Sequence, residues 1–223
     1  MNSPDLADEI CATAARLVVE EGMDYGPAKH KAARLLGQRR ATLPGNDVLE
    51  DAVRDYLALF CADTQPAELA ALRGVALQCM DLLAEFRPLL VGAVWRGTAT
   101  RLSAVRLRLY CDDSKAAELA LLNRRIDFDL ASEPGPRGQP VDVLVLAMPC
   151  AALGESVCVQ LSVLDHDDVR GALKADAQGR SQAGDAAALR RLMADPAATG
   201  ADACAPALPM RSLTGPSFDG GPA

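Results

Sequence analysis

The segment that decides the fold runs from Gly92 to Leu107 and reads GAVWRGTATRLSAVRL. It places a turn with two glycines between two segments that have the patterns of strands. Before the turn, residues 89–94 form a short apolar run typical of a buried strand. After it, residues 104–111 alternate between apolar and other side chains, as in a strand with one buried face. The segment therefore predicts two strands joined by a glycine-containing turn.

This segment resembles the signature of the nucleotidyltransferase superfamily, whose small members read roughly G-S-x-A-R-G-T-A-x-x-x-S-D-x-D-L. In that family the glycines let the backbone approach a triphosphate, and turn amides and hydroxyls hold phosphate oxygens. The resemblance implies a mixed sheet flanked by helices over residues 87–195. The whole chain is also similar to uncharacterised bacterial proteins labelled nucleotidyltransferase. The positions that match in register are Gly92, Arg96, Gly97, Thr98, Ala99, Ser103, Val105 and Leu107.

Three functional positions of that signature carry different residues in this chain. Ala93 stands in place of the serine, and Ala104 and Arg106 stand in place of the two strand aspartates. In the family, those aspartates share divalent metals that activate the attacking hydroxyl and neutralise the leaving pyrophosphate. A lone third carboxylate would not hold two metals. The first hypothesis is therefore a non-catalytic protein of this fold, with no metal and no cofactor.

Two other hypotheses stay open at this point. One is an active nucleotidyltransferase with relocated carboxylates, which would transfer a nucleotidyl group from a nucleoside triphosphate. The other is a helical adaptor that acts through residues 1–86, with the rest of the chain as a scaffold. The carboxylates available to the relocated enzyme are Asp112, Asp113, Asp127, Asp129 and Asp142.

Arginines gather around the glycine-containing turn of an otherwise acidic protein. Residues 87–110 include five arginines and no acidic residue. Arg106 and Arg108 share one face of the predicted strand, and a planar guanidinium can bind phosphate directly. The same two arginines could instead form cross-strand ion pairs with Asp127 and Asp129, a purely structural role.

The candidate ligand-binding residues combine the matching motif positions with these arginines. The ligand would be a nucleotide or another phosphate-bearing molecule, and a protein partner is the alternative occupant of the same face. No catalytic residue is assigned. The candidates are Gly92, Arg96, Gly97, Thr98, Ser103, Arg106 and Arg108.

Apolar spacing along the chain predicts the α+β class. An N-terminal helical region covers residues 1–86, the nucleotidyltransferase-like domain covers 87–195, and a tail expected to be disordered covers 196–223. The expected helices cover residues 6–21, 27–36, 46–60, 64–86, 112–123 and 186–193. Beyond the two strands named above, the expected strands cover residues 126–130, 141–148 and 156–164, the last two as an antiparallel pair. A loop is expected over residues 133–140.

Composition limits the classes of protein that the chain can represent. The net charge is −7 and half of the residues are apolar, which indicates a sizeable core and argues against nucleic-acid binding. The chain shows no secretory leader and no apolar stretch of about 18 residues, so we expect a soluble, cytoplasmic protein without membrane partners. The seven cysteines lack C-x-x-C spacing, which indicates reduced thiols, and the two separated histidines argue against structural zinc.

Three further features have ordinary structural interpretations. Residues 165–168 read Asp-His-Asp-Asp, and we expect a solvated loop because adjacent residues rarely converge on one ion. The basic residues from Lys29 to Arg40 are expected on a solvated helix face, since no aromatic side chain interleaves them to stack bases. Trp95, the only tryptophan, is expected to anchor the core for the helical half rather than to stack on a base.

We predict that the protein binds no divalent ion near Ala104 and Arg106, because the carboxylates that would hold one are absent. Calorimetric titration with magnesium and with manganese should show no micromolar binding. Micromolar binding abolished by changing Asp127, Asp129 or Asp142 would support the active enzyme instead.

Overall fold

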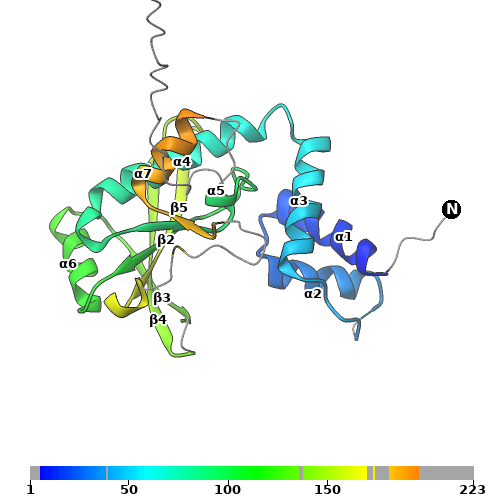
Figure 1. Ribbon diagram of the computed structural model, residues 1–223, viewed down its shortest axis with the longest axis horizontal. Coiled ribbons are helices and arrows are strands. Elements are labelled where there is room, and N and C mark those ends of the chain that lie inside the picture. Colours follow the sequence, from blue (N-terminus) through cyan, green and yellow to red (C-terminus); the bar gives the residue numbers. More distant parts are fainter. Residues whose placement is uncertain (1–5, 39, 136–137, 170–172, 174–180, 196–223) are drawn as a thin grey trace, which may run out of the picture.

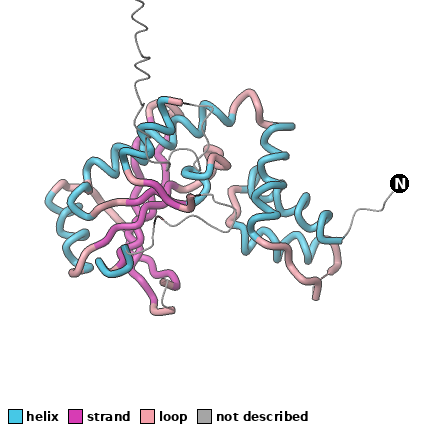
Figure 2. Tube along the Cα trace, viewed as in Figure 1, coloured by secondary structure: helices cyan, strands magenta, loops and turns pink. Residues whose placement is uncertain are grey.

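The computed structural model describes residues 6–38, 40–135, 138–169, 173 and 181–195. Three N-terminal helices form a lobe at one end of the molecule, and a sheet with its own helices forms the other end (Figure 1). The strands run through the middle of this second lobe (Figure 2). The expected α+β class is confirmed, with N-terminal helices followed by a mixed sheet. The expected tail, residues 196–223, lies outside the described residues.

The first lobe consists of three helices that bury their apolar faces against each other. These are α1 (Leu6–Glu21), α2 (Tyr25–Leu35) and α3 (Asn46–Phe60). α1 packs against both of the others, so it forms the centre of the lobe. Each lies within a few residues of its expected position. Side chains at most 2% exposed in this core are Ile10, Ala14, Ala15, Leu17, Ala28, Ala32, Leu49 and Val53.

The fourth helix leads from the first lobe to the sheet. It is α4 (Gln65–Leu82), and a single turn of 3-10 helix, η1 (Ala84–Phe86), follows it. Although α4 continues the N-terminal run of helices in the sequence, its buried side chains belong to the core of the sheet. They are Leu72, Val75, Ala76, Cys79 and Met80.

The second lobe is built on a mixed sheet, with six strands in the described residues and the order β3-β4-β5-β2-β1-β6. β2 pairs in parallel with β5, whereas the other neighbouring pairs are antiparallel. The expected antiparallel pair of long strands is β4 with β5. The strands are β1 (Leu89–Val91), β2 (Val105–Tyr110), β3 (Asp129–Pro134), β4 (Pro140–Cys150), β5 (Glu155–Leu164) and β6 (Ala183–Gly184).

Side-chain alternation in β2 separates the two faces of the sheet. The odd-numbered residues from Val105 to Leu109 are 0% exposed and lie in the main core. The even-numbered residues, Arg106, Arg108 and Tyr110, project from the opposite face, as the sequence pattern predicts. The helices that contribute to the main core are α4, α5 (Gly92–Arg96), α6 (Ser114–Asn123) and α7 (Ala186–Ala194).

Two strands differ from the expected positions. The first strand ends at Val91 rather than at residue 94, because the backbone turns at Gly92 into a short helix, α5 (Gly92–Arg96). The third strand covers residues 129–134 instead of 126–130, because the chain turns at Arg124 and Arg125 after α6 and Ile126 then packs against the core. The loop expected over residues 133–140 is correspondingly shortened, since β3 and β4 both extend into it.

Three smaller features complete the description. Residues 166–169 form a short 3-10 helix, η2 (His166–Val169). The six described cysteines are free thiols, in agreement with the expected reduced state. Among the described helices, none combines the length and the apolar character that a membrane crossing requires.

Trp95 is a core residue, but of the sheet rather than of the first lobe. Its side chain is 0% exposed and its indole Nε1 donates to the carbonyl oxygen of Ser181 at 2.9 Å. A Cβ added at Gly184 would overlap the indole ring. The two-residue strand β6 is therefore packed directly on the tryptophan. Its Ala-Gly sequence alone does not predict this contact.

We predict that Gly184→Ala destabilises the protein by about 1–3 kcal/mol, because the added methyl group overpacks the site of Trp95. The melting temperature should fall by about 2–4 °C for each kcal/mol. Gly74→Ala is the matched control, since a Cβ there meets nothing within 4 Å and helix α4 should gain up to about 1 kcal/mol. Equal melting temperatures for Gly184→Ala and the wild type would contradict the close packing.

Candidate functional site

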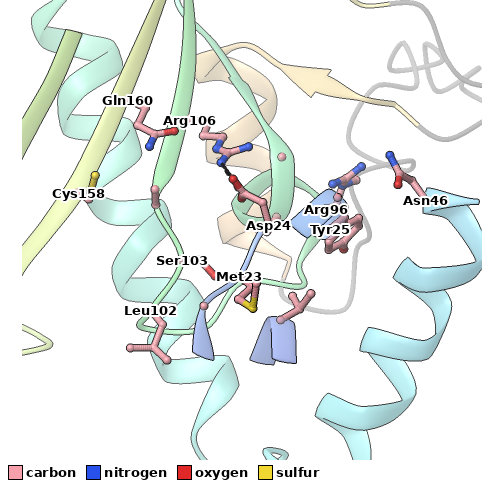
Figure 3. A pocket seen from close by; sticks show the side chains of 16 residues that line it. Met23, Asp24, Tyr25, Asn46, Arg96, Leu102, Ser103, Arg106, Cys158 and Gln160 are labelled. Atoms are coloured by element: carbon pink, nitrogen blue, oxygen red, sulfur yellow. Dashed lines mark hydrogen bonds and ion pairs between the residues drawn. The ribbon is translucent and has the colours of Figure 1, made fainter. Parts of the chain in front are cut away.

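A cavity of about 530 Å³ lies where the first lobe meets α5, β2 and β5 (Figure 3). One wall is the connection between α1 and α2, with Asp24 and Tyr25, and Asn46 at the start of α3 adds to it. The opposite wall includes Arg106 of β2 and Gln160 of β5. Segments that are far apart in the sequence therefore build this cavity together.

Two glycines fix the ends of α5 at the base of the cavity. Gly92 has a φ of 72° where the helix begins, and Gly97 has a φ of 83° where it ends. Both values lie in the left-handed region, where a side chain is strained. A Cβ at Gly92 would lie 3.7 Å from Cδ of Arg106, an ordinary contact. The backbone conformation, more than the available space, therefore requires glycine here.

Side chains of α3 and α4 bind the carbonyl groups of the α5 turn. Arg54 donates to the carbonyl oxygen of Arg96 at 2.7 Å. Gln65 donates through Nε2 to the carbonyl oxygens of Gly97 at 3.1 Å and Ala99 at 3.0 Å. Backbone carbonyl groups removed from water need hydrogen-bond donors, and these side chains supply them where the turn leaves the sheet.

A buried carboxylate ties the first lobe to the same turn. The Glu50 side chain is 5% exposed and lies 2.8 Å from Nη2 of Arg54 and 3.2 Å from Nε of Arg96. The Arg96 guanidinium also lies over the ring of Tyr25, 5.5 Å from its centroid. Arg96 is therefore held in place by α2 and α3 while it lines the cavity.

Arg106 contacts the first lobe through a second ion pair. Its Nη2 donates to both carboxylate oxygens of Asp24, at 2.7 and 2.8 Å (Figure 3). Both side chains keep substantial contact with water, at 40% and 62% exposed. The cross-strand pairs expected with Asp127 and Asp129 do not form, because the neighbours of β2 are β1 and β5, whereas β3 lies at the edge beyond β4.

The structure brings four of the seven candidate ligand-binding residues together around one cavity, namely Gly92, Arg96, Ser103 and Arg106. Gly97 ends the α5 turn, and Thr98 is only 2% exposed, so both lie behind the cavity wall. Arg108 shares a strand face with Arg106 but does not line the cavity.

Sequence reasoning missed the wall that the first lobe supplies. Asp24, Tyr25 and Asn46 line the cavity, yet they lie about fifty residues or more before the motif. Gly22, which ends α1 with a φ of 65°, marks a sharp turn at this point of the chain, but a turn alone does not reveal what it contacts. These residues reach the cavity only because the first lobe packs against the sheet.

Carboxylates are scarce around the cavity. Among the described residues, Asp24 is the one acidic side chain in its lining, and none of the five carboxylates proposed for a relocated active site takes part. Asp113 instead caps α6 by accepting from the amide of Lys115 at 2.9 Å. Within the described ranges, no group of three or more His, Cys, Asp or Glu residues has an arrangement suited to a metal ion.

Burial and the two arginines act in opposite directions on the pKa values of the titratable groups in the cavity wall. Burial raises the pKa of Tyr25, while the nearby charge of Arg96 acts in the opposite direction. Burial also raises the pKa of the Cys158 thiol, against the opposing effect of Arg106. Both groups are thus neutral at pH 7, and the cations of the cavity are Arg96 and Arg106.

Comparison of the chain with protein families, curated proteins and solved structures gave no match. The fold and the site therefore have to be interpreted from their own geometry. They define an α+β protein with a two-arginine cavity between a helical lobe and a mixed sheet.

We predict that Glu50→Ala lowers the free energy of unfolding by about 3 kcal/mol, because it leaves two partly buried arginines without their carboxylate. Asp81→Ala is the matched control, since Asp81 pairs with Arg190 at the surface with both side chains about half exposed, and should cost less than about 1 kcal/mol. Urea unfolding of the two variants measures both values. A similar small loss in both would show that Glu50 does not join the lobes.

Proposed function

We propose that this chain is a non-catalytic protein of nucleotidyltransferase-like fold that binds a phosphate-bearing ligand, such as a nucleotide, in the cavity beside α5. The observation that carries this proposal is the gathering of Gly92, Arg96, Ser103 and Arg106 around one cavity. These residues come from a short motif that resembles the signature of a triphosphate-binding superfamily. Their convergence supports a ligand site rather than a set of unrelated surface residues.

The contact between Arg106 and Asp24 supports an anionic ligand. The Arg106 guanidinium reaches both oxygens of the carboxylate through Nη2 alone, and a phosphate oxygen in the same position would accept from it in the same way. Because both side chains are partly exposed to water, the pair is of the kind that contributes little to stability and can be exchanged. A phosphate could therefore replace the Asp24 carboxylate without a large cost.

The residues around the cavity favour binding over catalysis. A metal-dependent transfer needs carboxylates that bridge divalent ions to the phosphates. At the corresponding strand positions this chain has Ala104 and Arg106, and both line the cavity. The arginine would contact an acidic ligand directly, so a bridging cation is unnecessary.

The proposal predicts that phosphate compounds stabilise the protein and that the effect depends on Arg106. Thermal-shift measurements with inorganic phosphate, AMP, ADP and ATP should raise the melting temperature of the wild type. Arg106→Ala should weaken the affinity roughly ten- to a hundredfold, as expected for one charge-assisted contact. Added salt should weaken binding as well, because the contact is between charges.

Arg101→Ala serves as the control for loss of positive charge. Arg101 also forms an exposed ion pair, with Glu155 at 3.2 Å, but does not line the cavity, so its replacement should leave binding unchanged. The exposed thiol of Cys158 offers an independent measurement, since an occupant should slow its alkylation. If no phosphate compound shifts the wild type, or if the two variants behave alike, the cavity is not a phosphate site.

A further inference from the structure

The outer face of the first lobe carries an apolar groove between α1 and α3, on a different surface from the cavity. Its volume is about 580 Å³. Large apolar side chains that line it remain open to water, with Leu59 73%, Phe60 65% and Val48 50% exposed. Single exposed apolar side chains are ordinary on a protein surface, but several gathered in one groove are typical of a surface that binds a partner.

Helix α3 has two apolar stripes, and the first of them is fully buried in the core of the lobe. Leu49, Val53 and Leu57 recur at helical spacing and are at most 6% exposed. A second stripe begins at Val48, continues through Ala52 and Tyr56, and ends at Phe60 on the groove side. Ala52 and Tyr56 of this second stripe pack partly against the core, whereas its two ends, Val48 and Phe60, remain open to water. The second stripe has the spacing of a helix face that packs against another helix.

The shape of the groove suits one helix. Two small side chains of α1, Ala12 and Ala15, form part of the lining opposite the larger residues of α3. A helix from another molecule could therefore lie close to the backbone of α1. Residues 48–60 extend about 18 Å along the axis of α3, which matches roughly three turns of a partner helix. Tyr56 and Phe60, with ring centroids 4.6 Å apart, stiffen one side of it.

Charge on the rim limits what the partner can be. Asp8, Asp51 and Asp55 lie among the groove residues, against one cation, Arg16. A second copy of this chain placed face to face would bring its own aspartates against these, and anionic lipid headgroups would meet the same repulsion. A basic partner would be attracted instead.

We propose that the groove between α1 and α3 binds an amphipathic helix of a partner protein, with the apolar stripe of that helix on Leu59 and Phe60 and its lysines or arginines beside the rim aspartates. This mode of recognition places the apolar face of a helix in a preformed groove. The proposal does not depend on the phosphate cavity, because the two surfaces share no residue.

The test uses a fluorescent helix of leucine and lysine, about 18 residues long, and a second peptide with every lysine replaced by glutamate. Fluorescence anisotropy with the full chain should show binding of the lysine peptide only. The double variant Leu59→Ser/Phe60→Ser should bind the lysine peptide at least about tenfold more weakly. The single variant Asp55→Asn should weaken binding and reduce its dependence on salt.

Leu119→Ser/Leu122→Ser is the matched control. These two leucines of α6 are 56% and 57% exposed and lie outside the groove, so their replacement should leave binding unchanged. Thermal melts of each variant confirm that the helices remain folded.

Several outcomes would overturn the proposal. They are equal binding of the two peptides, no binding of the lysine peptide, or an equal loss in the α6 control. Self-association that only the groove variant abolishes, measured by light scattering, would identify a second copy as the occupant. Binding to phosphatidylglycerol vesicles with the same dependence would identify a membrane instead.

Discussion

The Glu50 carboxylate, enclosed between Arg54 and Arg96, is the contact on which the arrangement of the two lobes depends. A carboxylate that is 5% exposed is costly to bury unless its charge is balanced, and here one arginine comes from its own helix and the other from the α5 turn. The pair of arginines therefore satisfies the carboxylate only when α3 is docked beside the turn. This requirement links a helix of the first lobe to the element that follows the first strand of the sheet.

That link has consequences for the cavity. With α3 in place, Arg54 and the first residue of α4, Gln65, reach the carbonyl groups of the turn, and the loop after α1 comes to rest against β2. The contacts that pair these polar groups thus also bring the walls of the cavity together. Its electrostatic character follows from the same contacts, since Arg96 is fixed by Glu50 and Arg106 keeps only a partner that is itself exposed. Arg96 is thus paired with a buried carboxylate, and Arg106 with an exposed one.

The two surfaces proposed to bind ligands, the cavity beside α5 and the groove between α1 and α3, differ in chemistry. The cavity is assembled from distant segments and has Arg96 and Arg106 in its lining, so charge and hydrogen bonding would dominate recognition of a ligand there. The groove between α1 and α3 is apolar with an acidic rim and arises within one lobe. The two sites would therefore bind different kinds of ligand. The lobe that carries the groove also supplies one wall of the cavity. An occupant of either site would therefore act on a helical lobe that both share.

Sequence by itself determined the local elements of this protein. The spacing of apolar residues located the helices and the long strands, and the alternation in β2 assigned Arg106 to the face away from the core, because these features depend on neighbours along the chain. It also showed that Ala104 and Arg106 stand where the nucleotidyltransferase signature has its two aspartates. Tertiary structure alone decided which strand lies beside β2, that Asp24 rather than Asp127 or Asp129 meets Arg106, and that Trp95 packs on Gly184. Those contacts join residues far apart in sequence, and their partners are chosen by the packing of whole elements, which no local pattern records.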